Sequence, residues 1–159
     1  MRILALDLAT NTGYYNGEAS PASIKFDKDT RMLSYWTWIG TMLYNEGEIL
    51  FDVVVMENAI GQRAQALEVF HMMKALTHLS AALLEIPVFQ YAPSTIKKVF
   101  TGNGHAKKDE VIKKCLDMGY DIPYRILKSG KNKGQTRYDD DAADAVAIYH
   151  TFLHHEGYK

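Results

Sequence analysis

Cysteine is almost absent from this sequence of 159 residues, which contains Cys115 alone. A single thiol forms no internal disulfide, and this indicates a reducing, intracellular compartment. The sequence also lacks any apolar run near the roughly 18 residues that a membrane span needs. Asp7 interrupts the N-terminal apolar stretch too early for a signal peptide. We therefore expect a soluble, cytoplasmic protein without a membrane partner, in which residues 1–159 form one domain.

A surplus of charge of either sign is also missing, because 18 Lys and Arg residues face 19 Asp and Glu residues and give a formal net charge of −1. Taken alone, this balance argues against nucleic acid as a ligand. The charges are segregated, however: residues 91–137 carry a net charge of +7, which leaves −8 for the remainder. Residues 125–137 contain no acidic side chain, and we interpret them as a flexible loop able to follow a phosphate backbone. A solvated charged face would show the same pattern.

Short apolar runs alternating with helical patterns predict an α/β protein with a mixed sheet. Strands are predicted at residues 1–8, 13–16, 32–39, 52–56 and 87–91. Helices are predicted at residues 41–51, 64–84, 94–100, 106–118 and 139–154, and a long loop is predicted at residues 17–30. The helix at residues 64–84 is apolar on more than one face. It therefore packs on the sheet and on a partner subunit, or it lies buried within one subunit.

Carboxylates stand where the predicted apolar elements end. Asp7 and Glu57 each follow an apolar strand, and the ends of adjacent parallel strands are where open α/β sheets place their sites. The last predicted helix adds Asp144, which shares a helix face with either Asp141 or Asp140. Acids in a first helical turn also suit the helix dipole, which does not explain Asp144. Converging carboxylates without cysteine ligands are typical of a hard cation such as Mg²⁺.

Four segments, in this order, resemble the RuvC family of Holliday junction resolvases, within the ribonuclease H-like nuclease superfamily. They are ILALDLATNTGYY (residues 3–15), VVVMENAIG (residues 53–61), YAPSTIKKVFTGNGHAKKDEV (residues 91–111) and DAADAVAIYH (residues 141–150). The combination is more specific than any one segment and spans nearly the whole chain. The resemblance implies a single RuvC-like nuclease domain with a ribonuclease H-like, mixed five-stranded sheet flanked by helices.

The resemblance also implies which residues act. Four catalytic acids that are at the same time metal ligands fall on Asp7, Glu57, Asp141 and Asp144, and Lys108 is implied as a further catalytic residue. The implied cofactor is Mg²⁺, two ions per active site with Mn²⁺ as a substitute, and the implied partners are branched DNA and a second copy bound through helix 64–84. DNA-binding residues are expected in the positive window at Lys97, Lys98, Lys107, Lys108, Arg125, Lys128, Lys131, Lys133 and Arg137.

The implied activity is structure-selective hydrolysis of Holliday junctions by two metal ions, with symmetric nicks that leave 5′-phosphate and 3′-hydroxyl ends. The sequence departs from the bacterial pattern in three ways: no aromatic residue closely follows Glu57, residues 17–30 form a longer connection, and residues 125–137 add a basic loop. These departures resemble viral members, for which the cytoplasm is that of the host. The alternatives are a debranching nuclease that also cuts forks and flaps, a non-catalytic junction-binding protein, and a nuclease that cuts the RNA strand of a hybrid.

Overall fold

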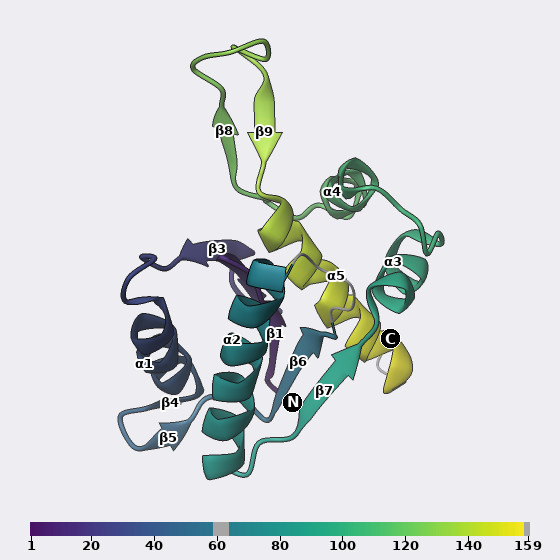
Figure 1. Ribbon diagram of the computed structural model, residues 1–159. Coiled ribbons are helices and arrows are strands. Elements are labelled where there is room, and N and C mark those ends of the chain that lie inside the picture. The colour runs from purple at the N-terminus through teal and green to yellow at the C-terminus, as the bar shows by residue number, and fades with distance from the viewer. Residues whose placement is uncertain (59–63, 158–159) are drawn as a thin grey trace.

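The computed structural model describes residues 1–58 and 64–157, which form three layers with helices on both faces of a central sheet (Figure 1). The sheet has five strands in the order β3-β2-β1-β6-β7. They are β1 (Ile3–Asp7), β2 (Asn11–Tyr15), β3 (Ala22–Lys25), β6 (Val53–Glu57) and β7 (Val88–Tyr91). β1 runs antiparallel to β2 and parallel to β6. The predicted mixed five-stranded sheet flanked by helices is therefore confirmed.

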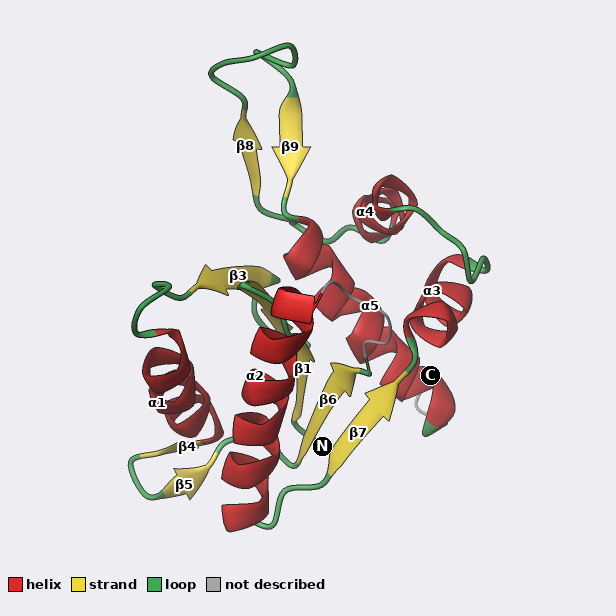
Figure 2. Cartoon of the chain, viewed as in Figure 1, coloured by secondary structure: helices red, strands yellow, loops and turns green. Residues whose placement is uncertain are grey.

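Helices flank both faces of the sheet (Figure 2). A separate hydrophobic core lies on each face. The helices are α1 (Arg31–Leu43), α2 (Ala64–Leu83), α3 (Pro93–Thr101), α4 (Lys108–Asp117) and α5 (Asp140–His155). Leu4 and Leu6 of β1 pack with α1 and α2, whereas Ile3 and Ala5 pack with α3, α4 and α5. Because side chains alternate along a strand, a strand covered on both faces is apolar throughout, as β1 and β6 are.

The predictions for residues 32–39 as a strand and 41–51 as a helix were wrong. Residues 31–43 form α1, whose buried side chains Tyr35, Ile39 and Leu43 recur every four residues, which is a helical stripe. The aromatic and β-branched residues between them favour strands in general, but here they lie on the flanks of the helix. The remaining edge strand is β3, inside the predicted loop, and residues 44–49 form a hairpin of β4 (Tyr44–Asn45) and β5 (Glu48–Ile49).

The prediction of an irregular loop over residues 125–137 was also wrong at its two ends. β8 (Tyr124–Ile126) pairs antiparallel with β9 (Thr136–Tyr138) and forms a hairpin that projects from the body beside the start of α5 (Figure 1). The polar composition of the segment between these strands concealed the alternation of side chains in the two strands. Within residues 1–58 and 64–157, no helix has the length and apolarity that crossing a membrane requires.

Candidate functional site

Two carboxylates lie side by side at the carboxyl edge of the sheet. Leu6 of β1 pairs with Met56 of β6 in the parallel ladder, so Asp7 and Glu57 are the next residues on neighbouring strands. In both strands four buried residues precede a carboxylate that is only partly buried. The apolar strands thus fix the backbone tightly, and they leave the two carboxyl groups at the rim of the core.

The first turns of α5 bring two further acids to this edge. Burial raises the pKa of Asp7 well above its ordinary value, and the charges of Asp144, Glu57 and Asp141 raise it further. The pKa of Asp144 is raised to about 7, chiefly by burial. Asp7 and Asp144 therefore each lie within electrostatic reach of the other three acids. Among the described residues, however, no three His, Cys, Asp or Glu side chains form a ready-made metal cage.

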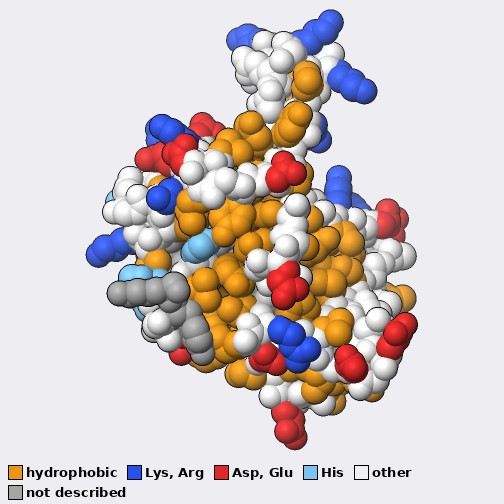
Figure 3. All heavy atoms as spheres, turned by 180° about the vertical axis from the view of Figure 1, so that it is seen from behind, with side chains coloured by type: hydrophobic (Ala, Val, Ile, Leu, Met, Phe, Trp, Pro, Cys, Tyr) orange, Lys and Arg blue, Asp and Glu red, His pale blue; other side chains and the backbone are white. Residues whose placement is uncertain are grey.

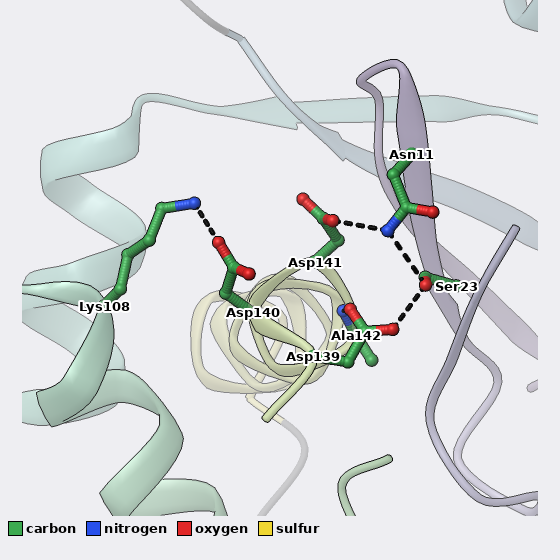
Figure 4. Close-up of polar contacts among 7 residues, drawn as sticks. All are labelled: Asn11, Ser23, Lys108, Asp139, Asp140, Asp141 and Ala142. Carbon is green, nitrogen blue, oxygen red and sulfur yellow. Dashed lines mark hydrogen bonds and ion pairs between the residues drawn. The ribbon is translucent and has the colours of Figure 1, made fainter. Parts of the chain in front are cut away.

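A lysine lies beside these acids and is held by an ion pair. The Lys108 ammonium group at the start of α4 donates a hydrogen bond to Asp140 (Figure 4). Partial burial acts to lower the pKa of Lys108, but the hydrogen bond and charge of Asp140 and the charges of Asp144 and Asp141 outweigh it, so the pKa is raised. Burial acts to raise the pKa of Asp140, and the contact with Lys108 lowers it below its ordinary value.

Neighbouring acids on α5 point in different directions. Asp140 points toward Lys108, whereas Asp141 points toward Asn11 of β2 (Figure 4). The charge of Asp141, together with those of Asp144 and Glu57, acts on Asp7. Asp140 instead forms the ion pair with Lys108, although the charges of both Asp140 and Asp141 raise the pKa of Asp144.

The predicted DNA-binding residues divide into two groups. Lys97 of α3 and Lys108 lie close enough to the site that their charges lower the pKa of Glu57, although burial is the larger effect and the net shift is upward. The others are exposed side chains outside the acid cluster: Lys98, Lys107, Arg125, Lys128, Lys131, Lys133 and Arg137. Lys and Arg side chains gather around the projecting hairpin, where Figure 3 shows no acidic side chain near the tip.

A chain of hydrogen bonds that the sequence did not predict anchors α5 to the sheet (Figure 4). The side-chain amide of Asn11 donates to Asp141 Oδ2 at 2.5 Å and to Ser23 Oγ at 2.9 Å. Ser23 donates in turn to Asp139, whose other carboxylate oxygen accepts from the Ala142 amide at 3.1 Å and caps the helix. Burial raises the pKa of Asp141, and the bond from Asn11 works against that rise.

Comparison with known proteins finds relatives of one kind, although no family model matches the sequence. The crossover junction endodeoxyribonuclease RuvC of Methylobacterium radiotolerans is 33% identical over 104 residues, which cover 65% of this chain and 44% of that protein. RuvC of Chlamydia caviae is 37% identical over 115 residues, which cover 70% of this chain and 61% of that protein. The matched region is thus less than two thirds of the length of either relative.

A solved structure extends the likeness to nearly the whole chain. T. thermophilus RuvC in complex with a Holliday junction substrate matches with a TM-score of 0.72 at 18% identity, covering 99% of this chain and 97% of that one. At this level of identity the likeness concerns the fold. The comparisons thus show that the chain is similar in sequence to RuvC crossover junction endodeoxyribonucleases over part of their length, and that it has the ribonuclease H-like fold of the T. thermophilus protein.

Proposed function

We propose that this protein is a structure-selective endodeoxyribonuclease that resolves Holliday junctions by metal-dependent hydrolysis. The observation that carries the proposal is the meeting of Asp7, Glu57, Asp141 and Asp144 beside Lys108 at the carboxyl edge of the sheet. The sequence similarity to RuvC supports it, as does the Holliday junction bound to the T. thermophilus protein. A protein that only binds DNA gains nothing from four carboxylates facing phosphates.

The four carboxylates fit Mg²⁺, because every donor atom is an oxygen and the charges of neighbouring acids add to burial in raising the pKa values of Asp7 and Asp144. Two bound ions, for which Mn²⁺ would substitute, would activate a water molecule and stabilise the leaving 3′ oxygen. In this proposal Asp7 is the central ligand. Asp140 holds Lys108 beside the position of the scissile phosphate, where its ammonium group offsets phosphate charge. The products are 5′-phosphate and 3′-hydroxyl ends.

The exposed face of α2 fits a second copy of the chain. Met72, Leu79 and Leu83 are 46%, 49% and 73% exposed, and they follow one another at intervals of seven and four residues along one side of the helix. Phe70 and Met73 point the other way into the core. We infer a two-fold homodimer through this face, which would present two sites to a junction and produce symmetric nicks.

We expect Leu79→Glu to convert the dimer to a monomer, because it places a charge in the middle of the apolar face of α2. Sedimentation measures the change in mass. Ile49→Glu is the matched control, since Ile49 is a comparably exposed apolar residue, at 40%, on strand β5 of the separate β4–β5 hairpin. A Leu79→Glu protein that sediments like the wild type would remove α2 from the interface.

We expect Asn11→Ala to lower metal-dependent cleavage by roughly 10- to 100-fold, the usual effect of removing a residue that positions a metal ligand. Asn11 is a positioning residue: it donates a hydrogen bond to the carboxylate of Asp141, and in the proposal it affects cleavage only by orienting that carboxylate. The measurement is cleavage rate against Mg²⁺ concentration, where a lost orienting bond shifts the half-saturating concentration upward. Asn11→Asp, which cannot donate, should be no better than alanine, and an unchanged Mg²⁺ dependence for both variants would contradict this role.

The proposed function is tested on a panel of synthetic DNAs of equal length: a four-way junction, a fork, a flap, a linear duplex and an RNA–DNA hybrid, each with Mg²⁺ or EDTA. We expect cleavage of the four-way junction in Mg²⁺ and none of the duplex. Equal cleavage of forks and flaps would favour the debranching nuclease. Binding without cleavage, or cleavage of the RNA strand, would replace the proposal with one of the other two alternatives.

A further inference from the structure

The hairpin β8–β9 has two chemically different faces. Residues paired directly across an antiparallel ladder point to the same side, and neighbours along a strand point to opposite sides. The pairs Tyr124 with Tyr138 and Ile126 with Thr136 therefore share one face, and the pair Arg125 with Arg137 occupies the other. The two tyrosine rings lie 5.7 Å apart. We call these the aromatic face and the arginine face of the hairpin.

On the aromatic face, Tyr138 packs against the core that α3, α4 and α5 share, whereas Tyr124 and Ile126 are exposed. Tyr124 and Ile126 are 63% and 59% exposed, and the described residues outside the hairpin offer these side chains no apolar cluster. Hydrophobic side chains on the hairpin are visible below the basic tip in Figure 3. A hairpin of two strands is marginally stable in water by itself. Large apolar side chains on such an element are therefore more consistent with a binding surface than with a stabilising core.

The arginine face places like charges opposite each other, an arrangement that destabilises an antiparallel pair. Among the described residues, neither Arg125 nor Arg137 forms an ion pair with an acid. Lys128, Lys131 and Lys133 add further positive charge toward the tip, and residues 124–138 contain no acid. Charge complementarity thus points to a polyanion as the ligand of this hairpin.

The hairpin is joined directly to the proposed active site. Tyr138 is followed by Asp139, which caps α5, and then by the acids that meet Lys108 and Asn11. A hollow beside its base is lined by Arg125 and Arg137 together with Asp140 and Asp141. A DNA strand with its scissile phosphate at the acids would therefore leave the site along the hairpin.

We propose that the hairpin selects branched DNA: its arginine face binds phosphates of the strand leaving the active site, and Tyr124 and Ile126 stack against bases exposed at the branch point. In a continuous duplex both faces of a base pair are covered by its neighbours, so the aromatic face finds a partner only where stacking is interrupted. The inference rests on the proposed function and adds to it the element that recognises the branch.

The test compares binding of the full chain, in Ca²⁺ without cleavage, to a four-way junction carrying 2-aminopurine at the branch point and to a linear duplex. We expect Tyr124→Ala to lower the preference for junction over duplex by about tenfold, the effect of losing one stacked base, and to abolish the 2-aminopurine fluorescence change. Tyr124→Phe should retain both. The double variant Arg125→Gln, Arg137→Gln should bind both the junction and the duplex more weakly. The slope of log affinity against log salt concentration should fall by the equivalent of about two phosphate contacts.

Tyr44→Ala is the matched control, because Tyr44 is an exposed tyrosine, at 46%, on the distant β4–β5 hairpin, and its binding should equal the wild type. Equal losses on junction and duplex in Tyr124→Ala would overturn the inference. A change in sedimentation of that variant would also overturn it, since the aromatic face would then bind a second copy. If the wild type cuts no branched DNA, the proposed function fails; if it does and Tyr124→Ala keeps the full preference, only the inference fails.

Discussion

Asp7→Asn is expected to abolish metal-dependent cleavage of a four-way junction while leaving junction binding intact. The charges of Glu57 and of two acids of α5 all act on Asp7, and a neutral amide there is a poor ligand for a hard cation. The loss should be on the order of 10³-fold or more, because a catalytic metal contributes several kcal/mol and each roughly 1.4 kcal/mol is tenfold in rate. Single-turnover cleavage and gel-shift assays on the same junction measure the two properties separately.

Stability provides a second measurement for this variant. The folded pKa of Asp7 lies above that of the unfolded chain, because burial is its largest cause. The folded state therefore retains this proton longer, and the metal-free protein loses stability as the pH rises from the ordinary range of an aspartate through the folded pKa. Asp7→Asn lacks this loss. Its melting temperature without metal at neutral pH should equal or exceed that of the wild type.

The control for Asp7→Asn is Asp121→Asn, the same change at an exposed position between α4 and β8. It should leave cleavage and melting unchanged. Cleavage by Asp7→Asn at the wild-type rate would contradict the role of Asp7 as a metal ligand, and with it the proposed site. A variant that is inactive and also melts well below the wild type would show lost folding instead of lost chemistry.

The central strands could be predicted from the sequence because their residues are buried on both faces of the sheet and are therefore apolar in succession. β1 and β6 contain four buried residues in succession before an acid, and a run this short that is apolar on both sides is typical of a central strand. α1 could not be predicted in this way, since its tryptophans, tyrosine and threonines favour strands locally. Only the packing of Tyr35, Ile39 and Leu43 against β1 and α2 decides for a helix.

In the candidate site, too, some residues could be predicted from the sequence and others could not. Acids at the ends of apolar strands and inside a helix can be recognised from position, and the resemblance to RuvC then distinguishes Asp141 from Asp140. Asn11 and Ser23 carry no such signal, because they lie in polar segments and become neighbours of Asp141 and Asp139 only when β2, β3 and α5 assemble. Residues that position a ligand across 130 positions of sequence are a product of tertiary structure.

Gly13→Ala is expected to disrupt that assembly with a single methyl group. Gly13 lies in β2, paired with Asp7 on one side and Ser23 on the other. A Cβ atom at this position would lie 1.9 Å from the carbonyl oxygen of Asp141 and 2.4 Å from its carbonyl carbon. Both are backbone atoms in a close-packed layer, so β2 or the first turn of α5 must move. We expect the free energy of unfolding to fall by about 3 kcal/mol or more, with a melting temperature lower by roughly 10 °C.

Gly40→Ala is the control, because it measures the effect of replacing a glycine by alanine where no such close contact exists. Gly40 lies inside α1, and a Cβ there meets no atom within 4 Å. Since alanine favours a helix over glycine by about 1 kcal/mol, Gly40→Ala should melt above the wild type and cleave normally. Gly13→Ala should also lose cleavage, because Asp141 moves with the start of α5. If Gly13→Ala matched the wild type in both melting and cleavage, β2 and α5 would have to be farther apart than this contact requires, and the placement of Asp141 beside Asp7 would be wrong with it.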